Sequence, residues 1–148
     1  MPETSARRRR IYIQHGYSHS DMTPRDDPRS KKAAAVEALL PLAPASFHIL
    51  LALAGEDRHG YAVLLDVERR TGGEVRLSAA TLYRSIQRLL EDGLIVELRE
   101  RPAPELDDER RRYYRLTPLG EAVAQAETRR LSRLVRLARS AGIAPGTA

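Results

Sequence analysis

The feature that most constrains the fold of this chain is the stretch from Leu77 to Leu94, which reads LSAATLYRSIQRLLEDGL. Its large apolar residues recur at i, i+4, i+7 and i+8, the spacing of a single helical face. These residues are Leu82, Ile86, Leu89 and Leu90. Ser78 can begin the helix, because its hydroxyl can accept a hydrogen bond from a free N–H of the first turn. The stretch therefore predicts a capped amphipathic helix over residues 78–91, whose polar face carries Ala80, Tyr83, Arg84, Gln87 and Arg88.

The residues after this helix favour two strands joined by a charged loop. Leu94 to Glu100 suits a strand with Val96 and Leu98 on one face, and Arg111 to Leu116 suits a second strand with Tyr114 and Leu116 facing inward. The intervening residues contain two prolines and many charges, which is typical of a loop. Helix, strand, charged hairpin and strand is the order of a winged helix. The expected fold class is mainly α with a small β-hairpin (α+β).

Three helices are expected earlier in the chain, over residues 31–40, 44–54 and 59–71, and residues 74–77 suit a short edge strand. Phe47, Leu50, Leu51 and Ala54 share one face of the second helix, and Tyr61, Leu64 and Leu65 share one face of the third. His48 and His59 are expected to serve as packing or capping groups.

The closing helix begins at Thr117-Pro118, where Thr suits the cap and Pro the first turn, and it extends to about Arg139. It is longer than a small winged helix needs, so its apolar stripe would be half exposed in a monomer. A two-fold partner is the commonest way to cover such a stripe; the alternative is that the helix folds back over its own domain. The expected dimerisation residues are Leu119, Val123, Ala126, Leu131, Leu134, Val135 and Ala138.

These elements predict four regions. They are a disordered basic tail over residues 1–30, a winged-helix domain with an N-terminal helix over 31–117, a dimerisation helix over 118–140, and a frayed end over 141–148.

Composition narrows the possible functions. The chain has no cysteine, which excludes disulfides and thiolate chemistry, and no apolar run long enough to span a membrane, so a cytoplasmic protein is expected. The net charge is +5, but residues 1–32 alone carry +4, so a nucleic-acid function must depend on where the arginines lie. His15 and His19 have helical spacing but lie in a Gly- and Ser-containing tail, so no metal site is expected. No cofactor is expected either, and no catalytic constellation points to an enzyme.

The polar face of the helix over residues 78–91 suits the major groove of DNA. Arg84 can reach guanine and Gln87 can pair with adenine, while Ser78, Thr81 and Tyr83 near the helix N-terminus suit phosphate oxygens. The alternative is that Arg84 and Arg88 are only solvated and paired with Glu91 or Asp92.

The hairpin offers a second set of arginines. Arg110, Arg111, Arg112 and Arg115 could contact the DNA backbone, but Asp107, Asp108 and Glu109 precede them and would repel it. A solvated, salt-paired hairpin with Arg111, Arg112 or Arg115 as partial contacts is the favoured interpretation.

Three motifs resemble the PadR family of bacterial transcriptional regulators. They are FHILLALAGEDRHGY (Phe47–Tyr61), SAATLYRSIQRLLEDGLI (Ser78–Ile95) and RRYYRLTPLGE (Arg111–Glu121). The resemblance implies a winged helix-turn-helix with a C-terminal dimerisation helix, and a repressor that binds inverted-repeat operators. It places Thr81, Tyr83 and Arg84 in the DNA-contacting helix, and Leu131 and Leu134 on the dimer helix.

The chain departs from this family in two respects. The acidic run Asp107-Asp108-Glu109 replaces the Gly, Pro or basic residues usual in the wing. The absence of Trp means that a flat aromatic effector cannot stack between tryptophans, so any small-molecule effector is unknown. The predicted function is a homodimeric, sequence-specific regulator of transcription that binds double-stranded DNA; the alternative is a winged-helix module that binds protein.

Overall fold

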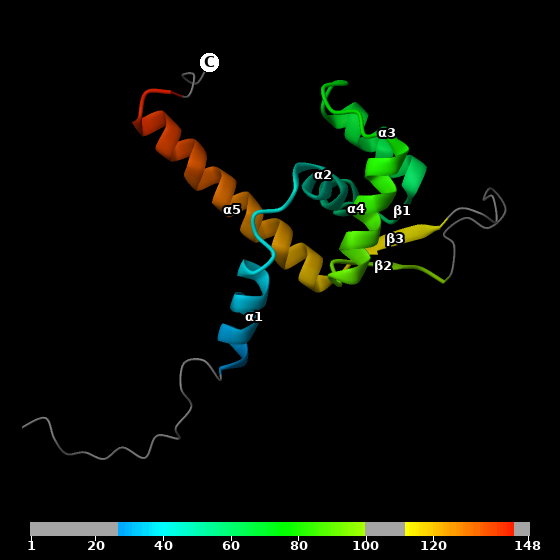
Figure 1. Cartoon of the computed structure of the whole chain (residues 1–148), viewed down its shortest axis with the longest axis horizontal. Coiled ribbons are helices and arrows are strands. Elements are labelled where there is room, and N and C mark those ends of the chain that lie inside the picture. Colours follow the sequence, from blue (N-terminus) through cyan, green and yellow to red (C-terminus); the bar gives the residue numbers. More distant parts are fainter. Residues whose placement is uncertain (1–26, 100–111, 144–148) are drawn as a thin grey trace, which may run out of the picture. The chain divides into compact units, whose positions relative to one another are not determined.

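The computed structural model describes residues 27–99 and 112–143 (Figure 1). Backbone contacts divide the chain into two units, Met1–Ala33 and Ala34–Ala148. The first helix crosses this boundary, and all features discussed below belong to the second unit. The elements in order are α1 (Pro28–Glu37), α2 (Pro44–Leu53), β1 (Arg58–His59), α3 (Gly60–Arg70), α4 (Ala79–Glu91), β2 (Ile95–Glu97), β3 (Tyr113–Leu116) and α5 (Pro118–Ser140).

Several predicted regions lie partly outside the described residues. These are the basic tail up to residue 26, the hairpin residues 100–111 with Arg111 among them, and residues 144–148. Residues 141–143 were expected to fray, but the N–H of Ile143 donates to the carbonyl of Ala138 at 2.9 Å. Gly142 adopts a positive φ of 75° there, so these residues form a helix C-cap.

A small antiparallel sheet has the strand order β1-β3-β2. Arg58 pairs with Tyr114, and Ile95 pairs with Leu116. The strand expected over residues 74–77 is absent, and its place in the sheet is taken by β1. The N–H of Val75 donates to the hydroxyl of Thr71 at 3.0 Å, so a side chain in the preceding turn satisfies the group that an edge strand would pair.

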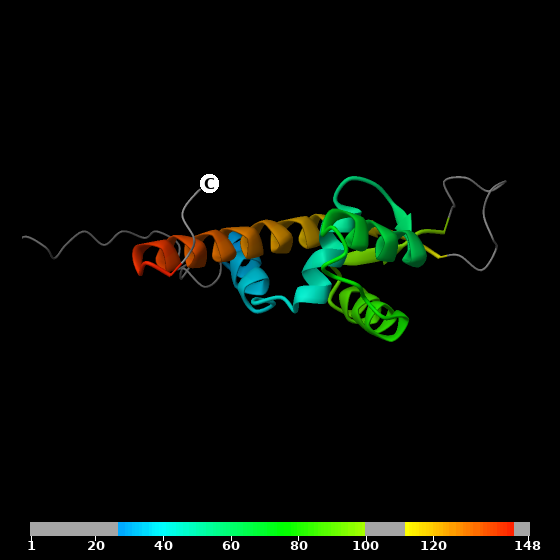
Figure 2. The ribbon, with the colours of Figure 1, turned by 90° about the horizontal axis from the view of Figure 1, so that it is seen from above.

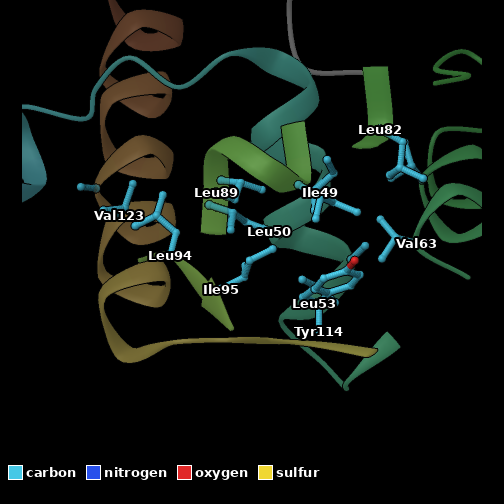
Figure 3. Close-up of a cluster of buried hydrophobic side chains, with 14 of the residues drawn as sticks. Ile49, Leu50, Leu53, Val63, Leu82, Leu89, Leu94, Ile95, Tyr114 and Val123 are labelled. Atoms are coloured by element: carbon cyan, nitrogen blue, oxygen red, sulfur yellow. The ribbon is translucent and has the colours of Figure 1, made fainter. Parts of the chain in front are cut away.

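The core gathers around α2 (Figure 3). It receives side chains from α3, α4, both hairpin strands and the first half of α5. Fully burying one large aliphatic side chain stabilises a fold by about 1.5–3 kcal/mol, so this shared core holds the winged-helix elements together. The largest of the fully buried apolar side chains are Ile49, Leu50, Val63, Val67, Leu82, Leu89, Leu94, Ile95 and Val123.

The buried faces of two helices differ from the expected ones. On α2, Ile49 and Leu53 are buried while Leu51 and Ala54 are exposed, because the helix is apolar nearly all round and its periodicity does not define a face. On α3, Tyr61 and Leu65 are 58% and 46% exposed, while Val63, Asp66 and Val67 are buried. The apolar pattern of α3 did not predict its buried face, because that face includes the charged residue Asp66.

The strand β2 has the opposite orientation to the one expected. Ile95 is buried and Val96 is exposed, because Leu94 and Ile95 both enter the core as the chain leaves α4. Tyr114 on β3 is buried and Leu116 is partly buried, which confirms the expected inward face of that strand.

Asp66 is buried in a network of arginines. Its carboxylate lies 2.6 Å from Arg69, 2.7 Å from Arg70 and 3.3 Å from Arg58. Burial alone would raise the pKa of Asp66, but the hydrogen bond from Arg69 and the charges of Arg58 and Arg70 outweigh it. The pKa of Asp66 therefore lies below its ordinary value of 3.8. Arg58 also donates to the carbonyl of Ala52 at 2.8 Å, which ties the end of α2 to α3.

The start of α5 is fixed by a close backbone contact with the end of α4. The Thr117 side chain caps α5 by accepting from the N–H of Gly120 at 3.0 Å, as predicted, and its hydroxyl donates to the carbonyl of Gly93 at 2.7 Å. A Cβ on Gly120 would lie 2.0 Å from the carbonyl oxygen of Leu94. Only glycine permits this approach, so the start of α5 packs directly against the backbone of the α4–β2 connection.

Candidate nucleic-acid interface

The helix α4 has the two faces that the sequence predicts. Ser78 caps it by accepting from the N–H of Thr81 at 3.1 Å. Leu82, Ile86 and Leu89 are 1–3% exposed and face the core. The opposite face is open to solvent and carries Ala80, Tyr83, Arg84, Gln87 and Arg88.

The polar side chains of this face differ in whether they are paired within α4. Arg88 lies 3.6 Å from Asp92, and the amide of Gln87 donates to Glu91 at 3.3 Å, so the C-terminal turn is paired within the helix. Arg84 has no acidic partner among the described residues. The solvated, salt-paired interpretation therefore describes Arg88, whereas Arg84 remains available for an external acceptor.

Tyr83 joins α4 to the start of α3. A Cβ on Gly60 would lie 3.2 Å from the Tyr83 hydroxyl, so the ring lies directly over the first turn of α3. His59 caps that turn by accepting from the N–H of Ala62 at 3.1 Å, which confirms its capping role. The His59 ring also meets Tyr113 edge to face, with centroids 5.4 Å apart. The two helices and the sheet therefore meet at the N-terminal end of α3.

Two described arginines of the hairpin, Arg112 and Arg115, each lie close to a carboxylate. Arg115 makes a two-pronged contact with Asp57, with a closest approach of 2.7 Å, and this contact raises the pKa of Arg115. It connects β3 to the loop before β1, so the Arg115 guanidinium is already paired within the chain. Arg112 is exposed and lies 3.6 Å from Glu97, a looser pair.

The helix α5 divides into two halves that the sequence did not distinguish. Val123 and Ala126 are buried in the core of their own chain, and Leu119 packs against that core. The expectation that Val123 and Ala126 form a dimer face is contradicted, because the domain itself covers them. Leu119 is only partly buried, so its assignment stays a prediction. Beyond Glu127 the large apolar side chains are exposed: Leu131, Leu134, Val135 and Leu137.

Leu137 is the most exposed of these, at 65%, and was missed because it falls outside the heptad-like stripe. Ala138 is half-buried. Figures 1 and 2 show this second half of α5, in orange to red, extending away from α3, α4 and the sheet.

Glu127 lies buried where the two halves meet. Its carboxylate accepts from the N–H of Leu42 and from Arg130. It therefore ties α5 to the segment that leads into α2.

No group of three or more potential metal-ligating side chains occurs in the part of the chain that the structure describes. His48 is half-buried on α2, and His15 and His19 lie outside the described residues. No helix among the described residues is long and apolar enough to cross a membrane.

Three helices, α2 to α4, followed by the β2–β3 hairpin and joined by β1 at the sheet edge, make a winged helix-turn-helix with α4 as its exposed helix. The model of the transcriptional regulator PadR-like family matches residues 49–126, which is more than half of the chain. The chain belongs to this family. The expectation of a transcriptional regulator rather than an enzyme is thereby confirmed.

Two curated proteins are similar in sequence. "Transcriptional regulator Rv3488" of Mycobacterium tuberculosis is 35% identical over 89 residues, which cover 60% of this chain and 77% of that protein. "Uncharacterized protein X" of Lysinibacillus sphaericus is 35% identical over 74 residues, which cover 50% of this chain and 65% of that protein. The chain therefore matches just under two thirds of the length of the second relative.

Solved structures show the same fold. A PadR family transcription regulator from Clostridium difficile R20291 has a TM-score of 0.55 at 21% identity, covering 66% of this chain and 97% of its own. A transcriptional regulator from Clostridium thermocellum has a TM-score of 0.56 at 20% identity, covering 73% and 94%. RosR of H. salinarum reaches 0.50 at 28% identity, covering 64% and 79%.

Proposed function

We propose that this regulator binds double-stranded DNA sequence-specifically by placing α4 in the major groove. The observation that carries the proposal is Arg84, an exposed guanidinium with no acidic partner among the described residues, on the open face of a helix whose other face is fixed in the core. An α-helix fits the major groove, and a bidentate Arg–guanine contact contributes about 1–3 kcal/mol of discrimination.

The remaining contacts follow from their positions along α4. Ser78 and Thr81 lie at the helix N-terminus, where the helix dipole favours phosphate. Ala80, Tyr83 and Gln87 lie on the same open face as Arg84, and Arg88 is a weaker contributor because Asp92 partly satisfies it. Arg112 is the described wing residue best suited to the DNA backbone, and Arg111 is proposed with it from its place in the sequence.

The regulator acts as a homodimer joined through the second half of α5. An open hollow of about 560 Å³ lies beside this surface, lined by Phe47, Leu131 and Val135 among others, and offers a seat for apolar side chains of a second copy. Exposed apolar patches of this kind mark interaction sites, and two-fold pairing is the commonest arrangement of soluble oligomers. Two α4 helices related by a two-fold axis would suit an inverted repeat, at which a bound dimer acts as a repressor.

The proposal is tested by fluorescence anisotropy with the promoter region of the chain's own gene and a shuffled fragment of equal length. Specific binding to an inverted repeat, with an affinity that falls steeply as salt rises, supports it. Arg84→Ala should relax base preference, whereas Arg112→Ala should weaken binding to both fragments alike. Equal affinity for both fragments would contradict sequence-specific binding.

A further inference from the structure

A hollow of about 720 Å³ lies beside α4, between this helix and the segment Ala38–Ala43 that leads into α2. The hollow has several aliphatic lining residues and no aromatic one. The aliphatic residues are Leu39, Leu40, Pro41 and Leu42 from the segment before α2, and Leu89 from α4.

Ser46 supplies a polar group that the fold does not use. It is 7% exposed, lines the hollow, and its hydroxyl has no hydrogen-bond partner among the described residues. A buried hydroxyl without a partner costs stability, and such a group in a native structure calls for an explanation. The simplest is an acceptor that arrives from outside the chain.

Two further observations indicate that this acceptor is an anion. Ser46 lies in the first turn of α2, at the positive end of the helix dipole, and the N-cap Ala43 makes no side-chain capping hydrogen bond. The buried Glu127 carboxylate binds the N–H of Leu42 just before this cap and leaves the Ser46 hydroxyl without a partner among the described residues. Arg84, the unpaired guanidinium, also lines the hollow. Hydroxyl, helix N-terminus and guanidinium together suit one carboxylate.

The remaining charges of the hollow limit the size of the anion. Arg88, Glu91 and Asp92 also line it, and the two carboxylates balance the two arginines. A chain of phosphates long enough to fill the hollow would meet Glu91 and Asp92, whereas a single carboxylate needs only part of the lining. The lining therefore favours a small monoanion over the DNA backbone.

We infer that this hollow binds a short aliphatic carboxylate, with its carboxylate toward Ser46 and Arg84 and its apolar chain against the leucines. If α4 reads DNA as proposed above, ligand and DNA exclude one another because both require Arg84. This second step depends on the proposed function, whereas binding of the carboxylate does not.

The test titrates the full chain with sodium hexanoate at constant ionic strength, followed by calorimetry. A ligand of this size is expected to bind with a Kd of about 1 mM. Hexanol, which lacks the charge, and inorganic phosphate, which lacks the chain, should each bind at least about tenfold more weakly. Equal binding of hexanol, or equal binding of phosphate, would overturn the inference.

Ser46→Ala separates a binding role from a structural one. It should weaken hexanoate binding about tenfold through loss of a hydrogen bond to a charged group, while the thermal midpoint stays the same or rises, because an unpartnered hydroxyl is removed. The matched control, Ser140→Ala at the exposed end of α5, should change neither value. A lower thermal midpoint for Ser46→Ala, or unchanged hexanoate affinity, would overturn the inference.

A competition titration tests the second step. The apparent DNA affinity should fall in proportion to the hexanoate added above its Kd, and hexanol should have no effect at the same concentrations. If DNA affinity is unchanged at saturating hexanoate, mutual exclusion is wrong. If no DNA binds at all, the proposed function fails while the calorimetric result still decides the carboxylate site.

Discussion

The two halves of α5 are one continuous helix, but they have different surroundings. In the first half Gly120 touches the backbone of Leu94, and Val123 is completely buried in the domain core. In the second half the leucines are exposed and five arginines occur between residues 128 and 140 with no acidic residue. A single apolar stripe in a sequence can therefore have two environments, one buried in the core of its own domain and one exposed on the single chain.

The largest expected effect comes from Gly120→Ala in the first half. Its Cβ would lie 2.0 Å from the Leu94 carbonyl oxygen, which is backbone and cannot move aside. Overpacking of this kind is expected to lower the free energy of unfolding by about 3 kcal/mol or more in chemical denaturation. The control is Gly55→Ala, where a Cβ has nothing within 4 Å and should cost less than about 1 kcal/mol. Similar losses in both variants would contradict the tight junction.

Val123→Ala gives the next effect. It removes two buried methyl groups and leaves a small cavity, which should lower the free energy of unfolding by about 2 kcal/mol. Self-association measured by analytical ultracentrifugation should be unchanged under conditions in which the protein stays folded. Weaker self-association without loss of stability would mean that the first half belongs to the interface after all.

Leu134→Ala is the matched change in the second half. Because Leu134 is exposed in the single chain, its removal should leave the unfolding of the isolated subunit within about 0.5 kcal/mol. The dimer dissociation constant should rise about tenfold or more, since interface leucines lose their burial on truncation. Sedimentation over a concentration series measures this, and an unchanged dissociation constant would remove α5 from the proposed interface.

The smallest expected effect is on the pH dependence of the free energy of unfolding, which Asp66 in the domain should influence and the second half of α5 should not. The lowered pKa of Asp66 stabilises the fold fully at pH values above its unfolded pKa, and this stability is lost as the pH falls through the lower native pKa. Domain stability should therefore decline below about pH 4. Asp66→Asn should flatten that decline in urea titrations. The second half of α5 carries no side chain that titrates there, so a decline equally steep in the Asn variant would show that other groups are responsible.

The helices that begin with a capping hydroxyl could be predicted from the sequence. Ser78 and Thr117 cap the helices that they were expected to cap, because an N-cap hydroxyl bonds an N–H of the same first turn and needs no distant contact. The polar face of α4 was predicted because its apolar residues have clear helical spacing.

The errors occurred where tertiary contacts override local pattern. The buried Asp66 reversed the expected face of α3, since three arginines from different positions make an inward carboxylate stable. The two-residue strand β1 was missed because pairing with β3, more than fifty residues away, creates it. Ser46 gave no sequence signal, because its meaning depends on a hydroxyl left without a partner once the chain has folded.

The junction of Thr117, Gly120 and Leu94 has a consequence for operator length. The first turn of α5 contacts the backbone of Gly93 and Leu94 directly, and no flexible linker separates α5 from the end of α4 at this contact. If two copies join at α5, the contact between α5 and the end of α4 in each copy fixes the distance between the two α4 helices. Such a regulator should tolerate base changes between half-sites far better than an inserted or deleted base pair, because a rigid frame cannot adjust to a new spacing.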